Sequence, residues 1–442
     1  MRNKKTKALL ASLLILAMLL AACTPSAPAP AAPAAPATPA PGADPAPAPA
    51  GDNVVQIGLI LPMSGLNADQ GRVNLDGAQL AVDRINERGG IQSLGGAMLT
   101  LVLEDNESDP DRSRMVAERM VDGNPDIVAI HGAAASAFVI PMLPTFERAG
   151  VPFITAQTSG YITAQGYEWI FAYAAQSPGF AGAQVGVLSW INETYNTGLS
   201  RIGLVYEDTE WGLTNARAAR DLIAQIPGFE LVYDQNFAPG AADLSPIVMG
   251  LMQAEAEVLF PTVYTHDARL LFQTMRQFGY DPIIVGGGGG FVLPEFAAEL
   301  GPYVDGILSV GSHIFDSATI MNNPQLQNLG AEFEARFGYF MTEQAVGAYG
   351  AIYLIAAALE NAGSTDRVAF RDAFRALDIA GLTPGGAMGF NEAGWNTNAV
   401  AVMGQWQQGP DGMFRTHAVY PPSEATVEFQ LTQLLIDIIE AQ

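Results

Sequence analysis

The chain has little of the chemistry on which most enzymes and metal proteins depend. Its 442 residues include one cysteine, Cys23, and four histidines, His131, His266, His313 and His417. A single cysteine cannot form an internal disulfide, and the sequence has no HExxH or GxSxG motif to mark a metal site or a nucleophile elbow. We therefore predict a protein that is not an enzyme and that uses no metal and no cofactor.

Lysine is absent beyond residue 7. The segment after the N-terminal signal holds 17 arginines against 45 acidic residues, a net charge of −28. With no basic patch and a strongly acidic balance, the chain does not have the electrostatics of a nucleic-acid-binding or anionic-lipid-binding protein. We expect no nucleic-acid partner.

The first 22 residues form an export signal. Arg2 and three early lysines precede an apolar run that ends in Leu20, Ala21, Ala22 and Cys23, the arrangement of a secretory signal peptide. The run is shorter than the roughly 20 apolar residues of a spanning helix. The ending resembles the bacterial lipobox, and this resemblance implies cleavage before Cys23 and a lipid on its thiol. A chance cysteine beside an ordinary cleavage site, or a single membrane helix, is the alternative.

Residues 24–52 consist almost entirely of proline and alanine. Such a segment has no large apolar side chain to bury, and dense proline favours extended polyproline II. We predict that residues 23–52 are a lipidated tether, reaching roughly 3.1 Å per residue if fully extended.

From residue 53 onward, short β-branched runs alternate with segments of helical period, which predicts an α/β fold with parallel sheets flanked by helices. The length exceeds the roughly 250–300 residues at which one core stops growing, so we expect two lobes. Expected strands are 54–61, 98–105, 126–132, 151–156, 201–208, 229–235, 256–263, 282–285 and 305–310. Expected helices are 74–90, 111–123, 138–150, 212–226, 266–280, 323–338, 342–363, 366–378 and 428–442, with a hairpin of 399–408 and 413–421.

The ends of the predicted strands carry the candidate binding residues. In open parallel sheets, ligands bind at the carboxyl ends of the strands. There Ser136 begins a helix, and Gln157, Thr158 and Ser159 follow the strand 151–156. Free amides, hydroxyls and helix N-termini suit an anion such as a carboxylate. Each of these residues could equally be an ordinary helix cap.

The second half of the chain offers aromatic residues and a glycine run. Trp211 and Tyr264 follow predicted strands and could cover an apolar ligand, although each could equally be core. Five consecutive glycines, 286–290, follow the strand 282–285. A phosphate-binding loop would need GxxxxGK[ST], and this loop has no lysine.

Several motifs resemble one family, the extracytoplasmic solute-binding proteins of the leucine, isoleucine and valine type, which serve ABC transporters and have the type I periplasmic-binding-protein fold. They are VQIGLILPMSG, DRINERGGI, LEDNESDP, GVPFITAQTSG, IGLVYEDTEWG and MRQFGYDPIIVG. The likeness extends over residues 54–421. It implies two Rossmann-like lobes joined by three crossover strands near 174–178, 309–315 and 388–398, with the ligand cleft between the lobes. The lobes would be 53–175 with 312–390 and 176–310 with 395–430, leaving a tail of 431–442.

The resemblance also implies roles for residues. Ser136, the Gln157 backbone and Ser159 match positions that hold the α-carboxylate of amino-acid ligands, and Trp211 and Tyr264 match aromatic residues of the second lobe that cover the ligand. The first of those two is usually tyrosine.

Two positions depart from the family pattern. Gln70 stands where leucine-type binders have tyrosine, and Gly288 stands where they carry the acid that neutralises the ligand ammonium. Because no carboxylate lies between residues 282 and 293, a standard amino acid would need another acid. Asp208, Glu210 and Asp267 are the nearest in sequence.

The sequence therefore predicts a monomeric, exported, lipid-anchored receptor of an ABC importer, partnered by its permease and ATPase subunits. The expected solute is small and bears a carboxylate, as a branched-chain or related amino acid, an amide or an organic acid. Two alternatives stay open. The same fold and site would serve a ligand sensor for a membrane signalling partner, and an exported amide hydrolase would need a nucleophile paired with a base in space.

Overall fold

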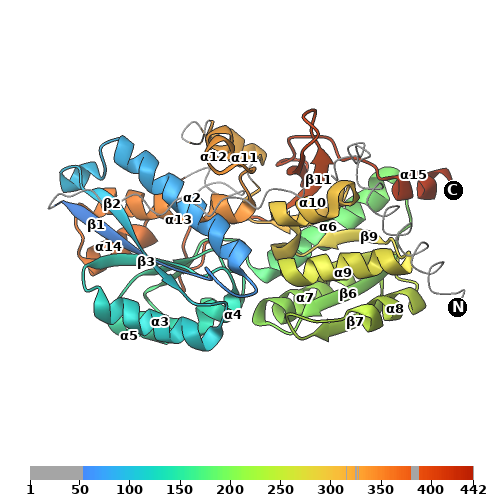
Figure 1. Ribbon diagram of the computed structural model, residues 1–442, viewed down its shortest axis with the longest axis horizontal. Helices are drawn as coiled ribbons and strands as arrows, with labels where there is room; N and C mark the ends of the chain where they lie inside the picture. The colour runs from blue at the N-terminus through green and yellow to red at the C-terminus, as the bar shows by residue number, and fades with distance from the viewer. Residues whose placement is uncertain (1–52, 315, 324–325, 327, 380–387, 442) are drawn as a thin grey trace, which may run out of the picture. The chain divides into compact units, whose positions relative to one another are not determined.

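The computed structural model describes residues 53–314, 316–323, 326, 328–379 and 388–441. The predicted signal, Cys23 and the proline- and alanine-rich tether lie outside these residues. The described chain forms two lobes, and each is built on a sheet of its own (Figure 1). The predicted α/β class, with parallel sheets flanked by helices, is confirmed.

The sheet of the first lobe has five strands in the order β2-β1-β3-β4-β5, and all of its neighbours are parallel. Its central strands are rich in Val, Ile and Leu because both faces are buried. The strands are β1 (Val54–Leu61), β2 (Met98–Asp105), β3 (Ile127–Gly132), β4 (Phe153–Thr155) and β5 (Ile170–Ala172).

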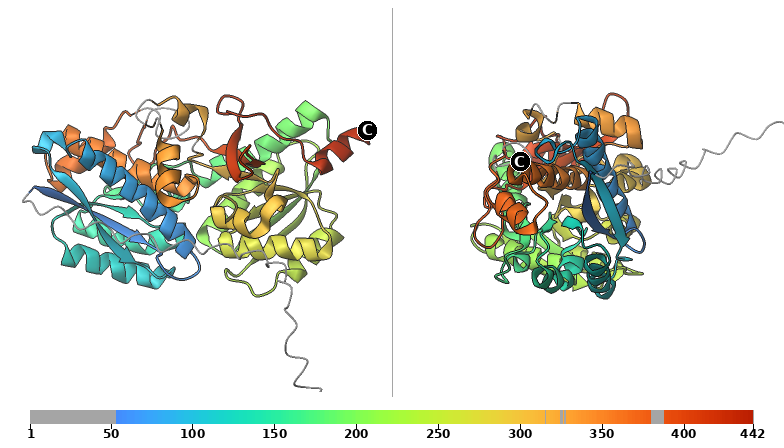
Figure 2. Two further views of the ribbon diagram at one scale, coloured as in Figure 1. Left: turned by 45° about the horizontal axis from the view of Figure 1, so that its top comes forward. Right: turned by 90° about the vertical axis from the view of Figure 1, so that its left-hand side faces the viewer.

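Helices cover both faces of this sheet (Figures 1 and 2). One apolar core includes α2 and α13, and another lies under α3, α4 and α5. The helices of this lobe are α2 (Ala68–Glu87), α3 (Pro110–Gly123), α4 (Ser136–Val139), α5 (Leu143–Ala149), α11 (Ala318–Met321), α12 (Leu329–Phe337), α13 (Glu343–Ala362) and α14 (Arg367–Arg375).

The sheet of the second lobe has seven strands in the order β12-β11-β10-β9-β8-β6-β7. Five are parallel, and the β11–β12 hairpin adds two antiparallel strands at one edge. The strands are β6 (Arg201–Glu207), β7 (Glu230–Phe237), β8 (Val258–Thr262), β9 (Ile283–Gly286), β10 (Leu308–Gly311), β11 (Val402–Gln408) and β12 (Phe414–Tyr420).

The second lobe is also covered by helices, which are α6 (Ser177–Tyr195), α7 (Glu210–Ile223), α8 (Ser245–Gln253), α9 (Thr265–Phe278), α10 (Pro294–Leu300) and α15 (Gln433–Glu440). Short 3₁₀ helices complete the described elements: η1 (Gln92–Leu94), η2 (Ile140–Met142), η3 (Gly160–Ile162), η4 (Gly289–Phe291) and η5 (Gly301–Val304).

The chain passes between the two lobes three times, from β5 to α6, from β10 to α11, and between α14 and β11. Each lobe is therefore assembled from segments far apart in the sequence. The carboxyl ends of β1, β3 and β4 and those of β6, β8 and β9 supply the loops from which the site is built.

Several predicted helices differ in extent from the structure. Helix α12 begins at Leu329, six residues after the predicted start, and α15 covers only Gln433–Glu440 of the predicted helix 428–442. Helix α2 begins at Ala68, six residues before the predicted start. The predicted helix 138–150 is divided into α4, η2 and α5, because Pro141 and Pro144 have no backbone N–H with which to continue an α-helix.

Helix α13 is long and apolar enough to cross a membrane, judged by length and composition alone. In this protein 72% of its most apolar window is buried inside the fold. Its side chains pack against α2 and the first sheet, as expected of a core helix.

Candidate functional site

A cavity lies where strand ends of the two sheets face each other. It leaves about 70 Å³ for the centres of water molecules, several times the roughly 10–15 Å³ that one water needs. The space suits a small solute. The lining residues are Gln70, Asn74, Ala134, Ala156, Gln157, Thr158, Phe180, Trp211, Tyr264, Gly289, His313, Glu343, Gln344 and Gly347.

One wall comes from the loops that follow β3 and β4. Gln157 and Thr158 line the cavity, and the Thr158 hydroxyl is buried without a hydrogen-bond partner. Ser136 follows Ala134 by two residues. It is fully buried, and its hydroxyl likewise has no partner. Buried polar groups are nearly always satisfied, so these two hydroxyls are suited to a bound molecule.

Helix α13 supplies a second part of the first-lobe wall. Glu343 and Gln344 lie in its first turn, and Thr342 caps the helix by accepting a hydrogen bond from Ala345 N at 3.2 Å. The backbone N–H of Ser312 donates to Glu343 Oε1 at 2.6 Å. Burial raises the pKa of Glu343 to about 7, although the Ser312 hydrogen bond opposes part of this rise.

His313 completes this side of the cavity. Its Nε2 is buried and has no partner. Burial and, to a smaller extent, the neighbouring His131 lower the pKa of His313 to about 3, so the ring is neutral at physiological pH. The sequence did not indicate Glu343 and Gln344, because α13 does not follow a strand and the strand-end rule does not reach it. His313 does follow a strand, β10, but was not assigned to the site.

The opposite wall belongs to the second lobe and is largely aromatic. Trp211 and Tyr264 lie with ring centroids 4.7 Å apart, tilted by 44°, and Phe180 from α6 lies beside them in the lining. The backbone N–H of Tyr264 donates to Glu207 Oε1. Burial raises the pKa of Glu207, and the nearby charge of Asp267 raises it further.

The glycine run fits closely against these aromatic side chains. Gly288 and Gly289 have φ of +94° and +61°, a region that favours glycine. A Cβ on Gly289 would lie 2.6 Å from the Trp211 ring, and one on Gly290 would lie 2.6 Å from the Tyr264 carbonyl carbon. The carbonyl of Gly289 accepts a hydrogen bond from Gln70 Nε2 of the first lobe at 3.2 Å. Gly289 therefore forms a part of the cavity wall that has no room for a larger residue.

Five of the predicted site residues line this cavity: Gln70, Gln157, Thr158, Trp211 and Tyr264. The other three, Ser136, Ser159 and Gly288, do not line it. Ser159 is buried, and its hydroxyl donates to Glu210 Oε1 at 2.9 Å. Gly289, the neighbour of Gly288, lines the cavity in its place.

None of the acids that are nearest in sequence to the glycine run lines the cavity. Glu210 is bound to Ser159, and Asp267 accepts hydrogen bonds from the backbone N–H groups of Gly240 and Ala241 at 2.8 and 3.1 Å. Asp208 is also absent from the lining, where Glu343 is the carboxylate.

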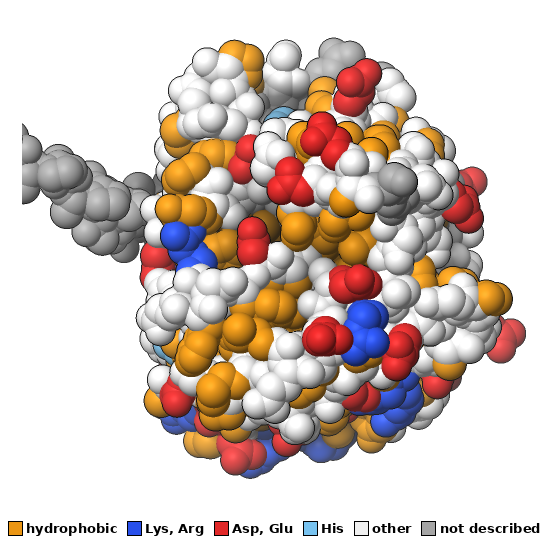
Figure 3. Space-filling view, turned by 90° about the vertical axis from the view of Figure 1, so that its right-hand side faces the viewer, with side chains coloured by type: hydrophobic (Ala, Val, Ile, Leu, Met, Phe, Trp, Pro, Cys, Tyr) orange, Lys and Arg blue, Asp and Glu red, His pale blue; other side chains and the backbone are white. Residues whose placement is uncertain are grey.

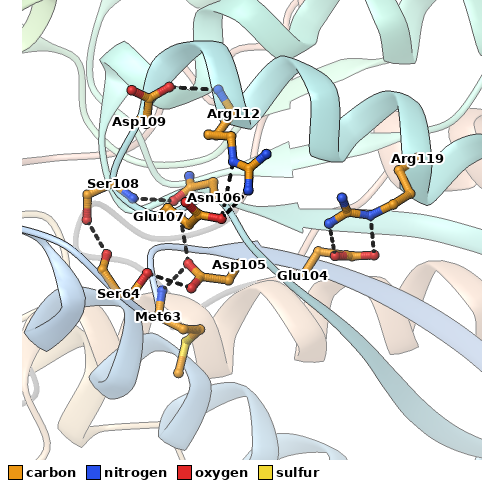
Figure 4. A network of polar contacts seen from close by, with 10 residues as sticks. All are labelled: Met63, Ser64, Glu104, Asp105, Asn106, Glu107, Ser108, Asp109, Arg112 and Arg119. Carbon is orange, nitrogen blue, oxygen red and sulfur yellow. Dashed lines mark hydrogen bonds and ion pairs between the residues drawn. The ribbon is translucent and has the colours of Figure 1, made fainter.

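The loop after β1 is shaped by Asp105 (Figure 4). Asp105 Oδ1 accepts from Met63 N at 2.8 Å and from Glu107 N at 2.7 Å, and Oδ2 accepts from Ser64 Oγ at 2.8 Å. Burial alone would raise the pKa of Asp105, but these hydrogen bonds lower it below its usual value. Ser64 is thus part of a loop that leads into α2, where Gln70 and Asn74 reach the cavity.

A second, larger cavity of about 410 Å³ lies at the amino ends of β9 and β10, beside α15. Figure 3 shows this end of the second lobe, with hydrophobic side chains gathered between acidic ones. Phe278 and Tyr303 are exposed by 39% and 54%. Because ligands of open α/β sheets bind at the carboxyl ends of strands, the smaller cavity is the candidate solute site.

The described residues contain no group of three or more His, Cys, Asp or Glu side chains that could hold a metal ion. His131, at the end of β3, is buried and bonded through Nδ1 to Ile154 O at 2.9 Å. His417 pairs with Asp316 at 2.8 Å.

Two α/β lobes linked by three chain crossings, with a cavity between opposed strand ends, define a two-lobed solute-binding protein. Residues 54–410 match the periplasmic binding protein family, and the chain belongs to that family. The resemblance seen in the sequence motifs is confirmed.

Curated relatives agree with this assignment. The Leu/Ile/Val-binding protein homolog 7 of Brucella abortus is 27% identical over 416 residues, which cover 89% of this chain and 96% of the relative. Homolog 8 of the same organism is 26% identical over 388 residues, covering 85% and 93%.

Solved structures share the fold. A leucine-binding protein of Thermotoga maritima has a TM-score of 0.69 at 24% identity, with 84% of this chain and 99% of that chain covered. A branched-chain amino acid transporter substrate-binding protein of Streptococcus pneumoniae, in complex with isoleucine, has a TM-score of 0.69 at 23% identity, covering 83% and 100%. Homologues of this kind are substrate-binding proteins, not enzymes.

Proposed function

We propose that this protein is the lipid-anchored receptor of an ABC importer and that it binds a small carboxylate-bearing solute in the cavity between its lobes. The observation that carries the proposal is the set of buried polar atoms without partners at the cavity. Three of these atoms belong to residues that line the cavity: Thr158 Oγ1, His313 Nε2 and Gln344 Oε1. The fourth is Ser136 Oγ, whose residue is two positions from the lining residue Ala134 in the sequence. Leaving such groups unpaired costs about 1–3 kcal/mol each, and a polar solute would pair them.

The solute carboxylate would be held by Ser136, the Gln157 backbone and Thr158, with Trp211 and Tyr264 covering its apolar part. Ser159 would first have to release Glu210. Lobe closure around the solute would present one form of the receptor to the permease. Export and anchorage through Cys23 are inferred from the N-terminal sequence, and the chain is proposed to act as a monomer.

Thermal-shift measurements on the soluble chain from about residue 52 test the proposal. The panel contains amino acids, their des-amino carboxylates, keto acids, amides and dicarboxylates. A solute at 100 times its Kd should add about 2.7 kcal/mol of stability. If no member of the panel shifts the melting temperature, the proposed function is refuted.

Two buried serines provide a matched pair of variants. Ser136 and Ser113 are both fully buried, but Ser113 Oγ donates to Asp109 O at 2.8 Å whereas Ser136 Oγ has no partner. Ser136→Ala should weaken solute binding by about 1–3 kcal/mol while leaving the free chain as stable as before. Ser113→Ala should do the reverse, and an unchanged affinity in Ser136→Ala would remove that serine from the site.

A further inference from the structure

The solute cavity contains a single formal charge. Of its lining residues, Glu343 is the only one with a charged side chain. His313 is neutral because burial lowers its pKa to about 3, and no arginine or lysine is part of the lining. The cavity therefore presents an uncompensated negative charge when Glu343 is ionised.

Glu343 is fixed in place by the protein backbone. Ser312 N holds Oε1 at 2.6 Å, and a Cβ on Gly311 would lie 2.8 Å from Glu343 Cδ, so the carboxylate rests directly on the Gly311 backbone. No ion pair joins Glu343 to any arginine among the described residues. The side chain is partly exposed, and it lines the cavity.

This arrangement is costly without a positively charged partner. Removing a carboxylate from water costs several kcal/mol unless hydrogen bonds or an opposite charge compensate, and one backbone N–H compensates only in part. The positive end of α13, a helix of 20 residues, favours a negative charge in its first turn. A cation in the cavity would therefore be enough to make Glu343 fully ionised.

The opposite wall also suits a cation. Trp211, Tyr264 and Phe180 place aromatic rings on the other side of the cavity, and aromatic faces attract cations. A positively charged nitrogen between Glu343 and these rings would be favoured from both sides.

We propose that Glu343 binds a protonated amino group of the solute, so that the ligand is a small ammonium compound. The inference rests on the proposed function. It places the carboxylate that contacts this amino group on α13 of the first lobe, and not in the glycine run of the second lobe.

Matched ligand pairs test this inference by isothermal titration calorimetry. The pairs are leucine with 4-methylpentanoate, phenylalanine with 3-phenylpropanoate, and alanine with propionate, which differ only in the amino group. At least one amino acid should bind tenfold or more tightly than its des-amino partner. In Glu343→Gln this preference should fall at least tenfold. Glu360→Gln should keep it, because Glu360 lies at the other end of α13, also accepts backbone N–H groups, and does not line the cavity.

The outcomes separate the two proposals. If a des-amino acid binds as tightly as its amino acid, and Glu343→Gln leaves the ratio unchanged, the role of Glu343 is refuted and solute binding stands. If no member of any pair binds the wild-type chain, this inference and the amino-acid reading of the solute are both refuted. In that case the wider panel of keto acids, amides and dicarboxylates decides whether the chain binds solutes at all. Should Glu343→Gln fail to fold, a wild-type chain that binds each des-amino acid as tightly as its amino acid would still refute the role of Glu343.

Discussion

Replacing Gly289 by alanine should disturb the cavity more than replacing another glycine by alanine at a position with equal backbone strain. Gly289 has φ of +61°, so any L-residue there costs about 1–2 kcal/mol. The new Cβ would also lie 2.6 Å from the Trp211 ring and 3.3 Å from Val263 O. Trp211 is 5% exposed and packed on Tyr264, so it has little room to move, and overpacking of this kind costs about 1–3 kcal/mol.

Gly279 supplies the control. It ends α9 with φ of +65°, and nothing lies within 4 Å of a Cβ added there. Gly279→Ala therefore carries the same strain without the collision. Both variants also reduce the entropy of the unfolded chain by a similar amount, about 0.4–1 kcal/mol, which cancels in the comparison. The difference between them isolates the contact with Trp211.

Urea unfolding followed by fluorescence measures this difference. Gly289→Ala should lose about 1–3 kcal/mol more free energy of unfolding than Gly279→Ala, with unchanged m-values. Solute affinity should fall in Gly289→Ala alone, because Trp211 lines the cavity. Equal losses of stability in the two variants, with equal affinities, would refute the claim that the glycine run exists to fit the aromatic wall.

Three further predictions concern charge. Asp105→Asn should lower the free energy of unfolding by about 1.5–3 kcal/mol at pH 7. Because the folded-state pKa of Asp105 is lowered, this difference in stability from the wild type should disappear as pH falls through that pKa. A difference in stability that persists at pH 2 would contradict the prediction. Glu295 of α10 pairs with Arg72 of α2, so Glu295→Gln should weaken solute binding by up to about 1 kcal/mol. Glu299 lies on the same helix but pairs within its own lobe, so Glu299→Gln should leave solute binding unchanged. Equal effects of the two variants in calorimetry would refute a role of the Glu295–Arg72 ion pair in lobe closure. Burial raises the folded-state pKa of Glu343 to about 7. The stability of the wild type relative to Glu343→Gln should therefore fall by up to about 3 kcal/mol as pH rises from about 4.5 to about 7. A stability difference that is independent of pH in thermal unfolding would show that the pKa of Glu343 is not raised.

The fold could be predicted from the sequence because its strands are short, buried and regularly spaced. The predicted strands 54–61 and 98–105 coincide with β1 and β2, and the predicted hairpin turn falls at Gly409 to Gly412, where Gly412 has φ of +80°. By contrast, β5 was not predicted. It has three residues, as β4 does, but β4 lies within the longer predicted strand 151–156. Pairing with β4 determines the conformation of β5.

The candidate site could be predicted only where it follows strand ends. Thr158, Trp211 and Tyr264 were found because topology places the loops after parallel strands at one edge of a sheet. Glu343 and Gln344 were not, because they begin a helix that enters the site from a distant part of the chain. Their proximity to the cavity depends on how α13 packs against α2 and the first sheet, and no local pattern in the sequence encodes that packing.

The cavity lining divides polar and apolar roles between the lobes. Its amide, imidazole and carboxylate side chains and the Thr158 hydroxyl come from the first lobe, whereas the second lobe contributes the aromatic side chains Phe180, Trp211 and Tyr264 and the backbone of Gly289. A solute could therefore make its directional contacts on the first lobe alone. The second lobe would then add apolar coverage and exclude water, which strengthens the electrostatic contacts already made. On this division, selectivity among solutes depends on the first lobe, while the glycine run and its aromatic neighbours determine how large a solute the closed cavity accepts.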